Sequence, residues 1–180
     1  WVIGTTWLQA MAASQELIDG FGKLTRANPH QITSFHPEAA IGALKRRVDS
    51  GGMVVVDQDI YPVAPIGTEF ADLVLPAATW GEEDFTRCNG ERRLRLYSKF
   101  YDAPGEAKPD WWIIAGFAKR MGFNGFDWKD SNAVFEESAR HGRGGVLNYH
   151  PLVVKAKQEG KRAHDLLRTF GTEGIQTPIR

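Results

Sequence analysis

The stretch that decides the fold is residues 53–62, which read Met-Val-Val-Val-Asp-Gln-Asp-Ile-Tyr-Pro. The run from Met53 to Val56 is fully apolar and predicts a strand buried on both faces, as parallel sheets covered by helices require. Asp57, Gln58 and Asp59 follow directly. Open α/β sheets bind ligands in the crevice at the carboxyl ends of their strands, so the sequence predicts ligand chemistry at this point.

Helices and strands are predicted on both sides of this strand. Residues 1–4 are apolar and strand-like, and apolar residues recur at helical spacing from Leu8 up to Gly20. Pro37 suits the first position of a helix that Gly51 and Gly52 can stop. A strand that ends at Pro76 is predicted within residues 68–80. The alternation predicts an α/β fold, with a Rossmann-like, mostly parallel sheet and flanking helices.

The second half of the chain is predicted to contain a hairpin and further helices. Asn89-Gly90 between residues 85–88 and 92–97 is a strong turn signal. A helix is predicted from Pro109 to Gly122, with Trp111, Ile114, Ala115 and Ala118 on one face. Beyond it, helical stretches are predicted at 132–140 and 151–170, separated by the glycine-rich residues 142–145, and the last ten residues are predicted to be extended or irregular.

Length and composition limit the possible partners. The chain has 180 residues, and its 22 basic and 22 acidic side chains leave no net field that would attract nucleic acid or an anionic membrane. No stretch reaches the roughly 18 apolar residues of a membrane span. Cys88 is the only cysteine, which excludes an internal disulfide and a cysteine-built metal site within these residues. Because Trp1 opens directly on an apolar run, we expect the sequence to be a piece of a longer chain.

No complete catalytic constellation is present. The sequence lacks a His-Glu-x-x-His motif, a nucleophile elbow, a Walker-type loop and a Gly-x-Gly-x-x-Gly loop, so we predict no catalytic residue and no metal ligand here. The five histidines are predicted to be helix caps or surface residues: His30, His36, His141, His150 and His164. The fragment alone is expected to be inactive.

Three acidic or amide positions remain as candidates for binding. Gln58 and Asp59 follow the central strand, where a carboxylate can accept two hydrogen bonds from a ribose or from the N–H edge of guanine. The same position also fits an acidic turn residue or a helix cap. Asp110 stands at a helix start, where backbone N–H groups and the helix dipole stabilise a carboxylate without any ligand. The acidic run from Glu82 to Asp84 also fits a solvated turn.

The ordered succession of these motifs resembles a known family. It comprises the valine-rich strand with Asp59, Ala-Asp-Leu-Val-Leu-Pro-Ala-Ala-Thr-Trp at 71–80, Asn-Gly-Glu-Arg-Arg at 89–93 and Ala-Pro-Gly-Glu-Ala-Lys-Pro-Asp-Trp at 103–111. In this order the chain resembles the large subunits of the DMSO reductase family of molybdopterin oxidoreductases over residues 1–122. The resemblance implies that residues 1–122 form part of a molybdopterin guanine dinucleotide-binding domain, and that residues 123–180 are an extension towards the next domain.

Within that family, three segments resemble the arsenite oxidases: residues 86–89, 93–101 and 127–132. This resemblance implies a molybdenum bis(molybdopterin guanine dinucleotide) centre that oxidises arsenite to arsenate, with an iron–sulfur cluster held by an N-terminal part outside this sequence. It also implies a small Rieske iron–sulfur subunit, a soluble acceptor such as cytochrome c or azurin, and a periplasmic location. An enzyme of the nitrate reductase or formate dehydrogenase type, or a non-catalytic nucleotide-binding domain, remains an alternative.

The resemblance also points to specific residues. Five positions match cofactor-contacting positions of the family: Thr6, Gln58, Asp59, Glu83 and Asp110. Nitrate reductases have Asn where Thr6 stands and Lys where Glu83 stands. A glutamate cannot pair with phosphate, so a contact at Glu83 requires an N–H donor on the cofactor or passes through the backbone.

Overall fold

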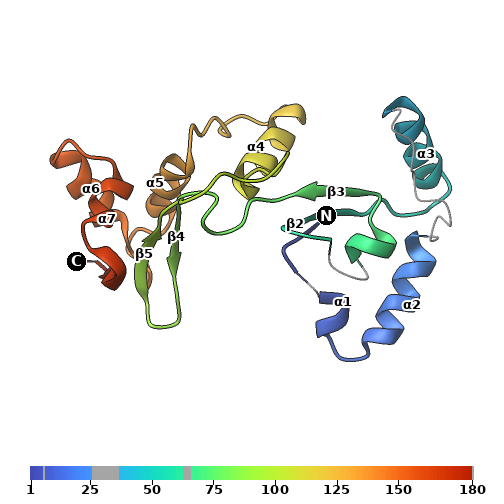
Figure 1. Cartoon of the computed structure of the whole chain (residues 1–180), viewed down its shortest axis with the longest axis horizontal. Coiled ribbons are helices and arrows are strands. Elements are labelled where there is room, and N and C mark those ends of the chain that lie inside the picture. Colours follow the sequence, from blue (N-terminus) through green and yellow to red (C-terminus); the bar gives the residue numbers. More distant parts are fainter. Residues whose placement is uncertain (6, 26–36, 63–65, 180) are drawn as a thin grey trace. The chain divides into compact units, whose positions relative to one another are not determined.

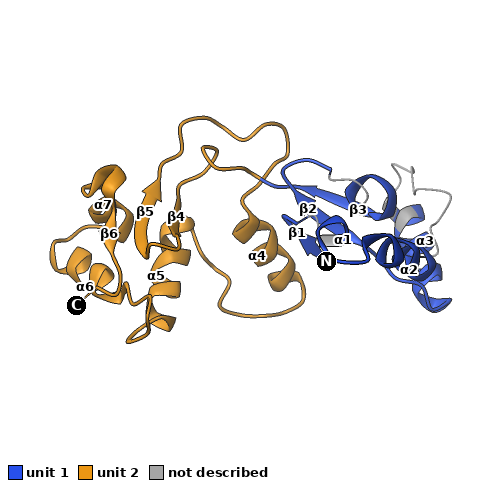
Figure 2. Cartoon of the chain, turned by 90° about the horizontal axis from the view of Figure 1, so that it is seen from below, with its two compact units in different colours: residues 1–77 blue, residues 78–180 orange. Residues whose placement is uncertain are grey.

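The computed structural model of the chain describes residues 1–5, 7–25, 37–62 and 66–179 (Figure 1). The chain forms two compact units, residues 1–77 (unit 1) and residues 78–180 (unit 2), coloured separately in Figure 2. The predicted cofactor-binding domain, residues 1–122, includes residues of both units, and its boundary stays a prediction.

Unit 1 is built around a parallel sheet of three strands, in the order β1 (Val2–Ile3), β2 (Val56–Asp59) and β3 (Leu73–Pro76). The central strand β2 pairs with β1 from Val2 opposite Asp57 and with β3 from Val56 opposite Leu73. The predicted α/β class with a parallel sheet and flanking helices is confirmed.

The start of β2 differs from the prediction. The expected strand at 53–56 is wrong, because the strand runs over Val56–Asp59 and its polar residues lie inside it. The Val55 N–H donates to the carboxylate of Asp72 at 2.8 Å, and the Val55 carbonyl accepts from the backbone N–H of Asp72 at 2.8 Å. The side chain of Asp72, just before β3, thus takes the place of a backbone acceptor on the neighbouring strand. The regular strand therefore begins one residue later, at Val56.

The helices of unit 1 are α1 (Trp7–Ala10), α2 (Ser14–Thr25) and α3 (Pro37–Asp49), with the short π-helix η1 (Ile66–Phe70). The single helix predicted from Leu8 is wrong: Ala13 adopts a left-handed φ of 57°, which separates α1 from α2. The predicted α3 is confirmed. The core of the unit consists of Leu8, Val55 and Ile66, with Val2, Leu17, Ile18, Phe21 and Phe70 packed around them.

Unit 2 contains an antiparallel sheet in the order β4 (Phe85–Cys88), β5 (Arg93–Tyr97) and β6 (Ile175–Gln176). Its β4–β5 pair is the predicted Asn89-Gly90 hairpin. The helices are α4 (Asp110–Arg120), α5 (Ser131–His141), α6 (His150–Gln158) and α7 (Ala163–Arg168), followed by the 3-10 turn η2 (Gly171–Glu173). These positions confirm the helices predicted in the second half of the chain.

The core of unit 2 joins its hairpin to its last three helices. Leu94 of β5 packs with Phe135 of α5, Leu152 of α6 and Leu167 of α7. Because these contacts bridge long sequence separations, the C-terminal helices hold the hairpin in place. Among the described residues, no helix is long and apolar enough to cross a membrane.

Candidate functional site

The carboxyl end of β2 carries three buried polar side chains in succession. Asp57, Gln58 and Asp59 are 1%, 0% and 8% exposed. The carbonyls of Gln58 and Asp59 accept hydrogen bonds from the backbone of Gly4 and Ala77, each at 2.9 Å, so this end of β2 is fixed to both neighbouring segments. The carboxylate of Asp59 accepts from the N–H of Ile60 at 2.7 Å. Gln58 and Asp59 therefore lie at the sheet edge where the sequence predicted ligand chemistry.

Asp57 is the residue that the site prediction missed. Both of its carboxylate oxygens are buried and have no hydrogen-bond partner among the described residues. Burial, and then the charge of Asp59, raise the pKa of Asp57. A buried carboxylate without a partner is costly, so this position suits a ligand that brings N–H or O–H donors. The sequence feature that could have indicated Asp57 is the presence of two acidic residues between Val56 and Asp59.

Gly67 of η1 packs directly against the carboxylate of Asp57. A Cβ atom at Gly67 would lie 2.4 Å from Oδ2 of Asp57 and 2.9 Å from the Cα of Pro62. Any side chain at this position would therefore press on the carboxylate. The sequence supplies the one residue type that lets the backbone approach this closely.

Unit 2 brings together the other two predicted residues, Glu83 and Asp110. Glu83 follows a turn in which the backbone N–H of Thr79 donates to the side chain of Glu82 at 2.9 Å. The indole N–H of Trp111, the second residue of α4, donates to Oε2 of Glu83 at 3.0 Å. Asp110 is the first residue of α4 and is exposed. The beginning of α4 thus lies against the segment that precedes β4.

A cavity of about 510 Å³ opens at this place in unit 2. Its walls come from the segment before β4, the segment after β5 and the starts of α4 and α5, and its lining includes Glu83, Asp84, Lys99, Lys108, Trp111 and Asp130. Burial raises the pKa of Glu83, the hydrogen bond from Trp111 lowers it, and the charges of Asp110 and Asp84 raise it. Asp110 and Asp84 add negative charge near Glu83, so its carboxylate suits an N–H donor.

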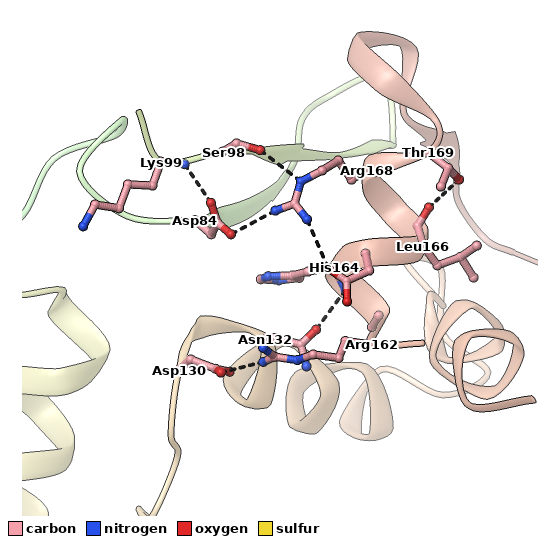
Figure 3. A network of polar contacts seen from close by, with 12 residues as sticks. Asp84, Ser98, Lys99, Asp130, Asn132, Arg162, His164, Leu166, Arg168 and Thr169 are labelled. Atoms are coloured by element: carbon pink, nitrogen blue, oxygen red, sulfur yellow. Dashed lines mark hydrogen bonds and ion pairs between the residues drawn. The ribbon is translucent and has the colours of Figure 1, made fainter. Parts of the chain in front are cut away.

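His164 departs from the prediction made for the histidines. It is 4% exposed, so the prediction of a cap or surface residue is wrong for this histidine. The backbone N–H of His164 donates to Oδ1 of Asn132 at 2.9 Å, and its ring lies 5.4 Å from the ring of Phe135. Figure 3 shows this ring between Asp84 and Asp130, pointing away from α7. Packing of α7 against α5 and the hairpin buries it.

The predicted site residues fall into two groups. Gln58 and Asp59 lie together in unit 1, and Glu83 and Asp110 lie together in unit 2. Thr6 lies outside the described residues. For all five, contact with a cofactor stays a prediction. In the part of the chain that the structure describes, no group of three or more His, Cys, Asp or Glu side chains could hold a metal ion.

The chain is similar to several known proteins. Residues 60–120 match the molybdopterin oxidoreductase family. The whole chain is 69% identical to the iodate reductase subunit IdrA of Denitromonas iodatirespirans and 63% identical to the iodate reductase subunit IdrA of Pseudomonas sp. (strain SCT), covering 20% of each. Over 72% of its length it is 38% identical to the arsenite oxidase subunit AioA of Herminiimonas arsenicoxydans, of which it covers 17%. The chain thus spans about a fifth of the length of these relatives.

Proposed function

We propose that this chain, which belongs to the molybdopterin oxidoreductase family, holds one guanine dinucleotide of the molybdopterin cofactor in a longer catalytic subunit. The family implies the molybdopterin cofactor, and the dinucleotide form is our proposal. When bound, the cofactor supplies a molybdenum centre that exchanges oxygen and electrons with the substrate. The residues of this chain bind and orient the cofactor's nucleotide end.

The observation that carries this proposal is the buried carboxylate of Asp57. Its oxygens have no hydrogen-bond partner among the described residues, and it lies beside Asp59 at the carboxyl end of a parallel sheet. Ribose hydroxyl groups and the N–H edge of guanine are donors, and a carboxylate accepts two such hydrogen bonds in fixed geometry. This match of donors and acceptors supports a nucleotide at this position.

Within unit 2, Glu83 and Asp110 form a separate acidic pair. Asp110 stands at the start of α4, and Glu83 accepts a hydrogen bond from the neighbouring Trp111. Both carboxylates accept N–H donors, and neither attracts phosphate. In this proposal they fix the orientation of a nitrogen-rich ring.

For the whole protein, we infer a reductase that acts on iodate. Identity of 69% and 63% over the entire chain, both to iodate reductase subunits, supports this substrate. In the two-electron step, one iodine–oxygen bond breaks, the oxygen leaves as water with two protons, and iodine gains the electron pair. The electrons come from a reduced donor outside this chain.

Arsenite oxidation is the second candidate. It is supported by 38% identity over 145 residues and by the arsenite oxidase-like segments at 86–89, 93–101 and 127–132. In this reaction an oxygen from water bonds to arsenic, the two protons of that water are released, and arsenic passes two electrons to an acceptor outside this chain. This candidate also implies an iron–sulfur cluster in another part of the subunit and a small Rieske subunit. It further implies a soluble acceptor such as cytochrome c or azurin, and a periplasmic location.

The test uses the full-length protein, expressed with its small partner in a host that makes the cofactor. We expect molybdenum and guanine nucleotide in the purified protein, and oxidation of a reduced viologen dye when iodate is added. Reduction of an oxidised dye by arsenite, without iodate activity, would favour the second candidate. Nitrate or formate activity alone would exclude both substrates. Protein without molybdenum would contradict the cofactor role itself.

A further inference from the structure

Helix α7 ties together two walls of the unit 2 cavity. Arg168, at its end, donates to the carboxylate of Asp84 at 3.0 Å and to the hydroxyl of Ser98 at 3.5 Å. Arg162, at its N-cap, donates to the carboxylate of Asp130 at 2.5 Å. Figure 3 shows Asp84 and Asp130 on opposite sides of the ring of His164. Both acids line the cavity. Helix α7 is therefore linked through its arginines to both walls.

Every oxygen of the two carboxylates already accepts a hydrogen bond. The second oxygen of Asp84 accepts from the backbone N–H of Lys99 at 2.7 Å. The second oxygen of Asp130 caps α5 by accepting from the N–H of Ala133 at 3.0 Å. Each acid thus holds one arginine of α7 and one backbone group of its own wall.

His164 lies at the centre of this arrangement with an unsatisfied ring nitrogen. Its Nε2 is buried and has no hydrogen-bond partner among the described residues. The charged groups around it come from every element packed against it: Asp84 before β4, Asp130 at the start of α5, and Arg162 and Arg168 at the two ends of α7. Farther along α5, Glu136 accepts from the side-chain amide of Asn132 at 2.9 Å. With a neutral imidazole, the two acids and two arginines balance.

A proton on His164 would disturb this balance. Burial, followed by the arginine charges, lowers the pKa of His164, while Asp84 and Asp130 raise it. The ring is therefore neutral at neutral pH, and the charged ring appears only in acid. An imidazolium would add a buried positive charge beside the arginines and would compete with Arg162 and Arg168 for the two carboxylates. Displacing either arginine frees α7 from one wall.

We propose that His164 is an acid-sensitive latch of the unit 2 cavity, whose protonation releases α7 from the Asp84 and Asp130 walls and weakens binding of the group held there. The second half of this proposal rests on the proposed function, because the bound group is then the cofactor. The first half concerns only the chain itself and is testable without it.

Amide hydrogen exchange of the full-length protein at pH 7.5 and pH 5.5, corrected for intrinsic rates, tests the latch. In the wild-type protein we expect the opening equilibrium at His164, Ala133 and Lys99 to rise at least about fivefold in acid. His164→Gln keeps a hydrogen-bonding side chain that does not titrate, and it should remove this response. His150→Gln is the matched control: His150 also has a lowered pKa but lies outside this arrangement, so the response should persist.

Absence of a response in the wild-type protein, or an equal response in His164→Gln, would overturn the latch. If His164→Gln does not fold, a wild-type pH series decides: selective opening centred below pH 6.5 supports the latch, and uniform opening of all amides overturns it. Molybdenum content at pH 7.5 tests the proposed function separately. For loaded protein desalted at pH 5.5, loss of molybdenum from wild type but not from His164→Gln supports the link to the cavity, and equal retention overturns that link.

Discussion

Asp57 in unit 1 is 1% exposed with neither carboxylate oxygen bonded among the described residues, whereas Asp84 and Asp130 in unit 2 each engage both oxygens. Asp57 thus differs from Asp84 and Asp130 in where its partners can come from. In unit 2 the chain supplies these partners: Asp84 joins α7 to the segment before the hairpin, and Asp130 joins α7 to α5. For Asp57 the chain supplies none among the described residues, so its carboxylate is suited to a partner from outside. Burial alone does not distinguish a structural acid from a binding one, but the hydrogen-bond partners do.

The largest expected effect follows from removing the charge of Asp57. Asp57→Asn in the full-length protein should lower cofactor retention about tenfold to a hundredfold, because a hydrogen bond to a charged acceptor contributes about 1.5–3 kcal/mol. Molybdenum content after extended dialysis measures this. Asp49→Asn, an exposed acid of the same unit, is the control and should retain the wild-type content. Full retention in Asp57→Asn would remove the contrast between the units.

Gly67→Ala tests the close approach in unit 1. Its Cβ would press on Asp57 and Pro62, so the variant should destabilise unit 1 by about 1–3 kcal/mol, as overpacking does. The measurement is amide exchange of β2 in the cofactor-free protein. Gly22→Ala is the control, since the nearest atom to its Cβ would be 3.5 Å away on Phe70. Equal exchange in the two variants would mean that the space at Gly67 is not restricted.

The third prediction concerns the cap of α5. Asp130→Ala removes both the N-cap and the partner of Arg162, and should destabilise α5 by about 1 kcal/mol. Asp130→Asn keeps a cap of similar quality and should cost clearly less. Hydrogen-exchange protection of the α5 amides measures the destabilisation in both variants. Equal destabilisation of α5 by the two variants would show that the hydrogen bonds of Asp130 do not stabilise this helix.

The smallest expected effect is an opposite pH dependence of the two units. The folded pKa of Asp57 is raised above 3.8, so its contribution to stability is full below pH 3.8 and is lost as the pH rises through the folded pKa. The folded pKa of His164 lies below 6.5, so its contribution is full above pH 6.5 and is lost as the pH falls through the folded pKa. Opening free energies of β2 and α7 in cofactor-free protein, measured against pH, should therefore slope in opposite directions, and parallel slopes would contradict the comparison.

Features set by local chemistry could be predicted from the sequence. The turn at Asn89-Gly90 and the helix between Pro109 and Gly122 follow from residues whose backbone preferences act within a few positions. The place of Gln58 and Asp59 at the carboxyl end of the buried strand was predicted from the neighbouring apolar run, although the strand itself lies at Val56–Asp59 and not at 53–56.

Features set by distant partners could not be predicted. The start of β2 depends on Asp72, which takes the hydrogen bond of Val55 across 17 residues. The burial of His164 depends on contacts with Asn132 and Phe135, which lie 32 and 29 positions earlier. No local pattern around either residue indicates these partners, because they become neighbours only when the units fold.

A structure of the full-length protein with its cofactor bound tests the central claim most directly. We predict a donor of the guanine dinucleotide within about 3.2 Å of a carboxylate oxygen of Asp57. Bonding of both Asp57 oxygens only to protein groups or water, with the dinucleotide elsewhere, would contradict this claim.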